Sequence, residues 1–87
     1  MSDVVMYSTG FCPYCVRAKM LLKNKNVEFT DIRIDVESDR RNEMVELSGR
    51  TSVPQIFIGD YHVGGCDDLF ALEQAGELDN KLGLINS

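Results

Sequence analysis

The stretch that decides the fold runs Val4-Val5-Met6-Tyr7-Ser8-Thr9-Gly10-Phe11-Cys12-Pro13-Tyr14-Cys15. Its first residues form a short apolar run, which together with two β-branched side chains predicts a buried strand. A loop follows, and Pro13 suits the first position of a helix, where the missing N–H of proline costs nothing. Cys12 is thereby predicted as the N-cap of a helix that runs to about Lys25.

The rest of the chain predicts further strands and helices. Alternating apolar residues predict a strand over 27–35, and a periodic segment predicts a helix that Ser38 or Asp39 begins and Gly49 ends. A hairpin is expected over 53–63, a third helix from about Asp67 to Gly76, and a short helix over 77–84. The side chains expected to face the core are Ala18, Leu21, Leu22, Leu69, Phe70 and Leu72, and the second helix is expected to carry the apolar residues Met44, Val45 and Leu47. The order β-α-β-α-β-β-α predicts one α/β domain over residues 1–87, with helices covering a four-stranded mixed sheet.

Composition restricts the partners of this chain. Its net charge of −5 over 87 residues argues against nucleic acid, because binding to phosphates depends on a basic face. No apolar run is long enough to cross a bilayer, and the first residues lack the basic and apolar pattern of a signal peptide. We therefore expect a cytoplasmic protein, in which three cysteines do not make a structural disulfide framework.

Cys12-Pro13-Tyr14-Cys15 is the strongest chemical signal in the sequence. Two cysteines three apart at a helix start lie on one face, within reach of a disulfide. The unpaired N–H groups and the dipole of the helix favour a thiolate at Cys12, which is the expected nucleophile. Cys15, one turn further in, is expected to be less exposed and less ionised, and to resolve the mixed disulfide by attacking Cys12.

Two other interpretations of this pair stay open. A zinc site would need two further ligands, for which the chain offers only Cys66 and His62 at unusual spacing. Alternatively, the two cysteines are inert core thiols, although buried structural cysteines seldom occupy a helix start. His62 is expected to be an exposed strand residue, and Cys66 a small residue at a helix cap in preference to a regulatory thiol.

Three motifs together resemble the glutaredoxin family, which has a thioredoxin-like fold. They are the Cys-Pro-Tyr-Cys site, the loop Thr51-Ser52-Val53-Pro54, and the turn Gly64-Gly65-Cys66-Asp67-Asp68 into the last long helix. The likeness covers about residues 3 to 82 and is greatest to the small bacterial dithiol members.

The resemblance implies glutathione as co-substrate, with no tightly bound cofactor and no metal. Glutathione would pair with the backbone of Val53 beside a cis Pro54, flanked by Ser52 and with Tyr14 near its glycyl end. Its γ-glutamyl carboxylate would meet the N–H groups of Cys66 and Asp67 beyond Gly65, and Asp67 or Asp68 would accept from its ammonium group. The two aspartates have a simpler possible role as helix caps.

One position departs from the family pattern. Many relatives carry a lysine three residues before the first active cysteine, where this chain has Thr9. That lysine would hold the glycyl carboxylate, so the resemblance leaves the affinity for glutathione in question. Arg17, Arg50 and Gln55 are unranked candidates to replace it.

The sequence therefore predicts a glutathione-dependent oxidoreductase that reduces protein disulfides and protein–glutathione mixed disulfides. We expect a monomer; ribonucleotide reductase is a client that the family suggests. An alternative is an iron–sulfur carrier with a cluster held between two protomers by Cys12 and glutathione, against which Pro13 and Cys15 argue. A third interpretation is a redoxin that a thioredoxin reductase reduces directly.

Overall fold

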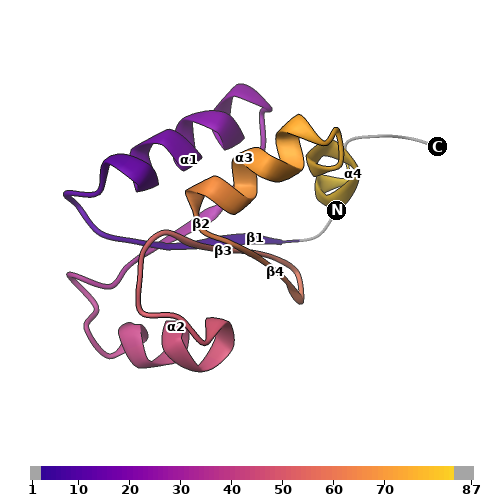
Figure 1. Cartoon of the computed structure of the whole chain (residues 1–87). Coiled ribbons are helices and arrows are strands. Elements are labelled where there is room, and N and C mark those ends of the chain that lie inside the picture. The colour runs from indigo at the N-terminus through magenta and orange to yellow at the C-terminus, as the bar shows by residue number, and fades with distance from the viewer. Residues whose placement is uncertain (1–2, 84–87) are drawn as a thin grey trace.

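A mixed sheet lies between two layers of helices in the computed structural model, which describes residues 3–83 (Figure 1). Its strands are β1 (Val4–Ser8), β2 (Thr30–Arg33), β3 (Gln55–Ile58) and β4 (Tyr61–Gly64). They lie in the order β2-β1-β3-β4, with β2 parallel to β1 and the other neighbours antiparallel. The predicted four-stranded mixed sheet is confirmed.

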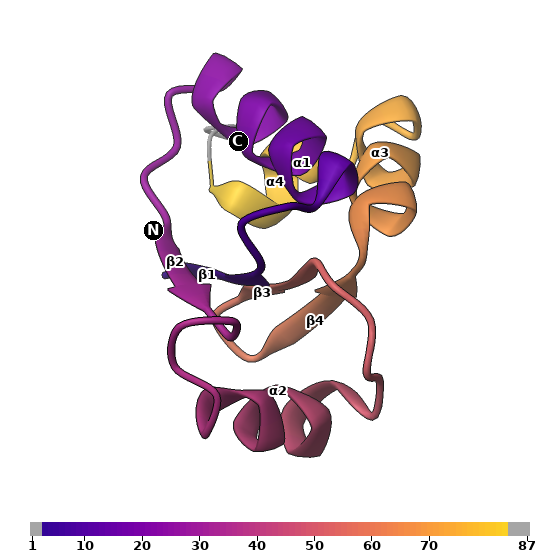
Figure 2. The ribbon, with the colours of Figure 1, turned by 90° about the vertical axis from the view of Figure 1, so that its left-hand side faces the viewer.

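The helices divide unequally between the two faces of the sheet. They are α1 (Pro13–Asn24), α2 (Arg40–Ser48), α3 (Cys66–Gln74) and α4 (Leu78–Leu82). Figure 2 shows α1, α3 and α4 on one face and α2 alone on the other. The short terminal helix was predicted to reach Leu84, which lies outside the described residues, as do Met1 and Ser2. Within residues 3–83 no helix has the length and hydropathy to span a bilayer.

Two apolar clusters fill the space between these layers, because successive side chains of a strand point to opposite faces. The larger cluster lies under α1, α3 and α4, and comprises Val4, Met6, Ala18, Leu22, Ile56, Ile58, Val63, Cys66, Leu69, Leu78 and Leu82. The smaller cluster faces α2, and comprises Tyr7, Ile32, Ile34, Met44 and Phe57. Leu21, Phe70 and Leu72, expected in the core, are partly buried at the border of the larger cluster.

The strands β2 and β3 are both shorter than predicted. The chain turns at Asn26, whose φ is 59°, and sheet pairing starts only where Thr30 meets Val5. The segment before Thr30 still packs on the core, but it does not pair. The third strand begins at Gln55 and not at residue 53, because Pro54 has no N–H to give to a sheet ladder.

Helix α2 differs from its prediction in detail. Its N-cap is Asp39, but that side chain makes no capping hydrogen bond, whereas Gly49 ends the helix with φ of 72° as expected. Met44 is buried and Val45 partly so, but Leu47 is 59% exposed. At 100° per residue Leu47 lies on the opposite side of Met44 from Val45, away from the stripe that contacts the sheet. Of the three apolar residues expected on this helix, Met44 and Val45 pack on the sheet and Leu47 does not.

Candidate active site

Cys12 caps the N-terminus of α1 with its own sulfur. Its backbone is extended, with φ of −125° and ψ of 103°, and Pro13 follows at the first helical position. The N–H of Cys15 donates to Cys12 Sγ over 3.1 Å. A sulfur that receives an amide hydrogen and faces the positive end of a helix is favoured as an anion. The predicted N-cap is confirmed.

Cys15 lies behind Cys12, with 0% of its surface exposed against 8% for Cys12. Burial is the main cause that raises the pKa of the Cys15 thiol to about 12, and the hydrogen bond with Cys12 adds to it. A hydrogen bond with the backbone of Thr9 acts in the opposite direction but is weaker. Cys15 is therefore a neutral thiol at physiological pH, as expected for a residue that waits to resolve a mixed disulfide.

The loop before α1 is tied to the chain that follows β2. The N–H of Gly10 donates to Asp35 Oδ2 over 3.0 Å, and Arg33 donates to both oxygens of the same carboxylate. These hydrogen bonds hold the pKa of Asp35 well below its usual range. A Cβ at position 10 would lie 2.4 Å from the Arg33 guanidinium, so a larger residue there would displace the end of the Arg33 side chain from its place beside Asp35. These hydrogen bonds hold the loop that leads to Cys12 against the segment that follows β2.

The loop before β3 presents a backbone carbonyl to the nucleophile. The Val53–Pro54 peptide bond is cis, as the resemblance implied, and Cys12 Sγ lies 3.8 Å from the Val53 oxygen, to which it donates in its protonated form. Because Val53 also lines the adjacent pocket, a substrate in that pocket lies beside the sulfur.

The side chain of Gln55 is fully buried and anchors this loop by hydrogen bonds. Its amide nitrogen donates to the carbonyl of Ser52 over 3.0 Å and to the Ser52 hydroxyl over 3.3 Å. Its amide oxygen lies 2.7 Å from Nε2 of His62, which is the donor since the Gln55 nitrogen is already engaged. The expectation that His62 is exposed was wrong: its ring stacks on Phe57, and burial chiefly lowers its pKa.

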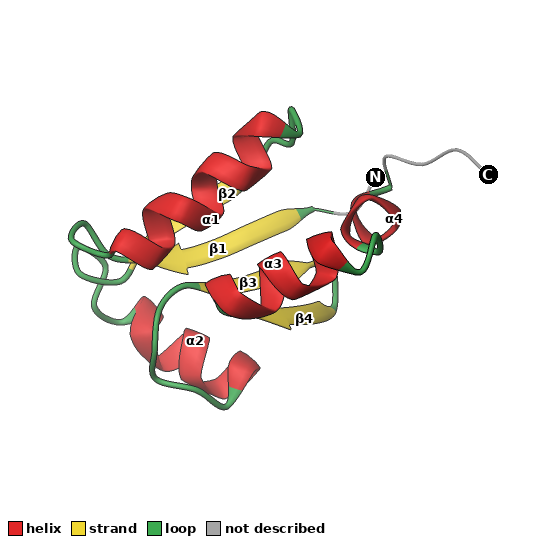
Figure 3. Ribbon diagram, turned by 45° about the horizontal axis from the view of Figure 1, so that its top comes forward, coloured by secondary structure: helices red, strands yellow, loops and turns green. Residues whose placement is uncertain are grey.

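The N-terminus of α3 lies at the same end of the sheet, where the loops before α1, β3 and α3 come together (Figure 3). Its N-cap is Gly65, which has no side chain to satisfy the first amides of the helix. Asp68 Oδ2 accepts from the Gly65 N–H and from Arg50, each over 3.0 Å, and both lower its pKa. Gly64 has φ of 113°, and a Cβ there would collide with the Asp68 carboxylate. Asp68 therefore serves at least as a helix cap.

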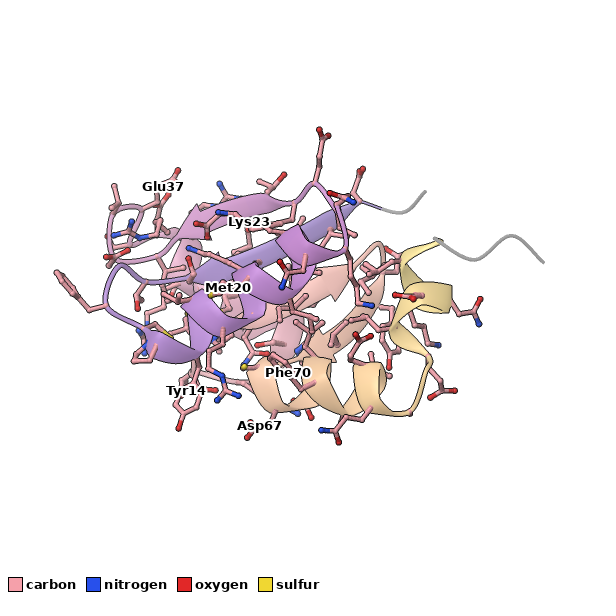
Figure 4. The ribbon with its side chains drawn as sticks, turned by 90° about the horizontal axis from the view of Figure 1, so that it is seen from above. Tyr14, Met20, Lys23, Glu37, Asp67 and Phe70 are labelled. Carbon is pink, nitrogen blue, oxygen red and sulfur yellow. The ribbon has the colours of Figure 1, made fainter. Side chains whose placement is uncertain are left out.

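A pocket of about 210 Å³ lies between these loops. Its lining consists of Tyr14, Arg50, Ser52, Val53, Pro54, Gly65, Cys66, Asp67 and Asp68. All eight residues that the sequence suggested for glutathione are in this set, although they come from three separate segments of the chain. Figure 4 shows Tyr14 and Asp67 at the same end of α1 and α3. The structure thus brings the predicted binding residues together next to the predicted nucleophile.

The comparisons with known proteins agree with this geometry. The family model described as Glutaredoxin matches residues 4–63. The chain belongs to the glutaredoxin family. It is 56% identical to a glutaredoxin of Pseudomonas aeruginosa, over 94% of this chain and 98% of the relative. It is 53% identical to glutaredoxin 3 of Escherichia coli K12, over 94% of this chain and 99% of the relative.

A solved structure extends the comparison to the fold. The crystal structure of a buckwheat glutaredoxin–glutathione complex superposes with a TM-score of 0.87 at 31% identity, covering 95% of this chain and 78% of that one. Together with the mixed sheet and its helices, this confirms the thioredoxin-like fold. This glutaredoxin has two neighbouring thiols, Cys12 and Cys15, at a helix start, and it is a thiol–disulfide oxidoreductase.

Arg50 is the pocket residue of this glutaredoxin that the sequence did not rank. Of the three candidates to replace the family lysine, only Arg50 lines the pocket. Gln55 is buried behind the loop, and Arg17 lies over the Phe70 ring, 5.4 Å from its centre. Arg50 directly precedes the Thr51-Ser52-Val53-Pro54 motif, and this position was the available signal.

The third cysteine of this glutaredoxin is part of the core. Cys66 is 4% exposed in the larger apolar cluster, and burial raises the pKa of its thiol. Across residues 3–83, no three His, Cys, Asp or Glu side chains are grouped closely enough to hold a metal ion. The zinc interpretation therefore has no ligand set within that range.

Proposed function

We propose that this chain reduces protein–glutathione mixed disulfides and protein disulfides, with glutathione as the electron donor. The proposal places the reaction in the cytoplasm, in a monomer that needs no tightly bound cofactor. It assigns nucleophilic attack to Cys12 and resolution to Cys15. The observation that carries it is the position of Cys12 Sγ, which accepts the Cys15 N–H and lies beside a pocket lined by the Val53–Pro54 loop.

On a glutathionylated client, Cys12 alone completes the chemistry. Its thiolate attacks the glutathione sulfur, the mixed disulfide breaks, and the client leaves as a thiolate that takes up a proton. A second glutathione thiolate then attacks the glutathione sulfur on Cys12, which forms glutathione disulfide and restores the Cys12 thiolate. Two electrons pass from glutathione to the client disulfide.

On a client disulfide, Cys15 is also needed. Cys12 attacks one client sulfur, and Cys15 then attacks Cys12 Sγ as its proton passes to the departing client thiolate. The product is a Cys12–Cys15 disulfide, which two glutathione molecules reduce. The high pKa of Cys15 suits this order, because a neutral thiol does not compete with Cys12 for the first attack.

Support for glutathione comes from the α3 N-terminus. Gly65 leaves the first amides of the helix without a side-chain acceptor, and such a terminus binds carboxylates. Arg50, which is ion-paired with Asp68, supplies a guanidinium to the same pocket in the absence of the family lysine at position 9. The buckwheat relative, whose structure is titled as a glutathione complex, provides a parallel.

An assay coupled to glutathione reductase tests the proposal with a small glutathione mixed disulfide as substrate. We expect Cys12→Ser to lower turnover by at least about a thousandfold, since no other residue supplies the nucleophile. Cys15→Ser should keep most of this turnover but lose the reduction of client disulfides. Replacing glutathione by an achiral dithiol tests the donor: equal efficiency would contradict the glutathione assignment, and turnover by Cys12→Ser would contradict the mechanism.

The iron–sulfur carrier is not the function that the geometry favours. Cys15 lies directly behind Cys12 and is hydrogen-bonded to it, so a second sulfur competes for the one that would hold the cluster.

A further inference from the structure

Gln55 is a buried polar side chain in an otherwise apolar strand. It has 0% of its surface exposed, and the residues that follow it in β3, Ile56, Phe57 and Ile58, pack into the two apolar clusters. A buried amide costs free energy unless its donors and acceptor are all engaged. An apolar side chain of similar size would fill the same space without that cost. This indicates a role for the Gln55 amide beyond packing.

Hydrogen bonds at both ends of the Gln55 amide fix its orientation. The two hydrogens of its nitrogen go to the Ser52 carbonyl over 3.0 Å and to the Ser52 hydroxyl over 3.3 Å. Its oxygen accepts from Nε2 of His62 over 2.7 Å. If the amide rotated by half a turn, its oxygen would face the Ser52 carbonyl oxygen, and neither atom could donate. The His62 N–H disfavours this rotation, because the amide oxygen would lose its donor.

His62 is held in place to make this contact. It pairs with Phe57 across the β3–β4 ladder, and the two rings stack with their centres 4.8 Å apart. Burial chiefly lowers the pKa of His62, Arg50 acts in the same direction, and Asp68 opposes them. A neutral imidazole has a single N–H, and the contact with Gln55 requires it at Nε2. His62 is therefore a fixed donor at physiological pH.

The hydrogen bond from Gln55 to the Ser52 carbonyl also orients the next residue. The Ser52 carbonyl and the Val53 N–H belong to one peptide unit, which is planar and trans. In such a unit the two groups point in opposite directions, so a carbonyl held toward Gln55 turns the N–H away from it. Val53 lines the pocket beside Cys12. The direction of the Val53 N–H thus depends on Gln55, and through Gln55 on His62.

We propose that His62 is a positioning residue for the glutathione part of the substrate, and that it acts through the Gln55 amide on the Val53 N–H. The inference rests on the proposed function, since it concerns how the pocket recognises glutathione and not how Cys12 attacks. His62 does not line the pocket, so its effect on the substrate is indirect. Disulfides without a peptide backbone should be insensitive to it.

The test compares two disulfides that differ only in the thiol offered to Cys12. One is the mixed disulfide of glutathione with thionitrobenzoate, and the other is that of mercaptoethanol with thionitrobenzoate. In the Cys15→Ser protein, the Cys12 thiolate bonds to the sulfur of glutathione or mercaptoethanol, and thionitrobenzoate leaves with the electron pair and is measured by its absorbance. The ratio of the two rates reports the recognition of glutathione, because unfolded protein or a less reactive Cys12 lowers both rates alike.

Two substitutions of His62 separate its donor from its packing. His62→Phe keeps a ring on Phe57 but has no N–H. We expect it to lower the glutathione rate about fivefold, the size of one lost hydrogen bond, and the mercaptoethanol rate by less than about twofold. His62→Gln loses the ring but has an amide N–H as many bonds from the backbone as Nε2 is. It should recover most of the glutathione rate.

A double substitution tests whether His62 acts through Gln55. Gln55→Met replaces the amide by an unbranched apolar side chain of similar length, and it should lower the glutathione rate about fivefold, as His62→Phe does. Adding His62→Phe to Gln55→Met should then lower the rate by less than about twofold further, because the hydrogen bond that it removes is already absent.

An unchanged ratio of the two rates in His62→Phe would overturn the inference. Equal losses in His62→Phe and His62→Gln would overturn it as well, because packing on Phe57 would then be the cause. Full additivity of His62→Phe with Gln55→Met would show that His62 does not act through the amide. The proposed function fails on a different result: a protein that retains His62 and Gln55 but reacts equally fast with both disulfides does not recognise glutathione.

Discussion

The N-termini of α1 and α3 lie at the same end of the sheet, and they are completed in opposite ways. At α1 the cap is a sulfur, and Cys12 accepts the amide hydrogen of Cys15. At α3 the N-cap is glycine, and the only side-chain acceptor, Asp68, takes the N–H of Gly65 itself. The first amides of α3 are thus directed toward the pocket. One physical feature, the positive end of a helix, serves a nucleophile in one place and offers an anion site in the other.

The buried thiols near the N-termini of α1 and α3, Cys15 and Cys66, also differ. Cys15 is the third residue of α1, and its N–H donates a hydrogen bond to Cys12 Sγ. Cys66 is the first residue of α3 and packs into the larger apolar cluster. Burial raises the pKa of both thiols, but only Cys15 is placed to attack the sulfur of a neighbour.

The largest expected effect concerns the rate of alkylation, which should distinguish Cys12 at the helix cap from Cys15 and Cys66. Near neutral pH, iodoacetamide should modify Cys12 at least about a hundredfold faster than Cys15 or Cys66, because only thiolates react and burial keeps the other two protonated. Peptide mapping by mass spectrometry at timed intervals measures this. In urea all three cysteines should react alike. Modification of Cys66 at the rate of Cys12 would remove the distinction between the two helix ends.

A smaller effect is expected on stability at high pH. A thiol whose pKa is raised by folding stabilises the native state below the unfolded pKa, and this contribution is lost as pH rises toward the native pKa. For Cys15 the window runs from about 9 to about 12, so the free energy of unfolding should fall by about 2 kcal/mol between about pH 8 and pH 10.5. Urea titrations at the two pH values measure it.

The matched variants for this experiment come from the same comparison. Cys15→Ala should flatten the alkaline decline more than Cys66→Ala does, because burial and the hydrogen bond with Cys12 both act on Cys15. Tyr7, whose pKa burial raises to about 12, remains in both variants and accounts for a residual slope. A slope that neither variant changes would mean that the two thiols do not set it.

The smallest expected effect tests whether the two helix ends act independently. Asp68→Ala removes the acceptor of the Gly65 N–H and the partner of Arg50, so the KM for a glutathione mixed disulfide should rise about fivefold. Asp68→Asn keeps an acceptor oxygen and should recover part of the loss. The rate of Cys12 alkylation should not change in either variant. A parallel fall in that rate would show that the α3 terminus also controls the nucleophile.

Local signals were sufficient to predict the elements that surround the nucleophile. Pro13 fixed the start of α1, and Gly49 fixed the end of α2, because each residue restricts the backbone by its own chemistry. The residues around the pocket were predictable only through the resemblance, since three motifs far apart in the sequence meet there.

What the sequence did not predict depends on contacts between distant segments. His62 is partly buried because Phe57, on the neighbouring strand, lies under its ring, and Gln55 supplies its acceptor. Leu47 is exposed because α2 alone, among the helices of residues 3–83, lies on that face of the sheet and contacts it through one narrow stripe. Arg50 has its role through Asp68, which is eighteen positions later in the chain. Periodicity and capping rules describe a single element and carry no information on such pairs.

The strand order β2-β1-β3-β4 divides the catalytic apparatus between two halves of the polypeptide. The half that ends with β2 holds both reactive thiols, whereas the half that follows α2 holds the cis-proline loop and the amides of α3. Neither half contains a complete site, and the halves meet along the β1–β3 ladder. Recombination between related genes within the α2 segment would therefore exchange substrate recognition while leaving the redox pair intact, a modular route by which such small proteins can diversify.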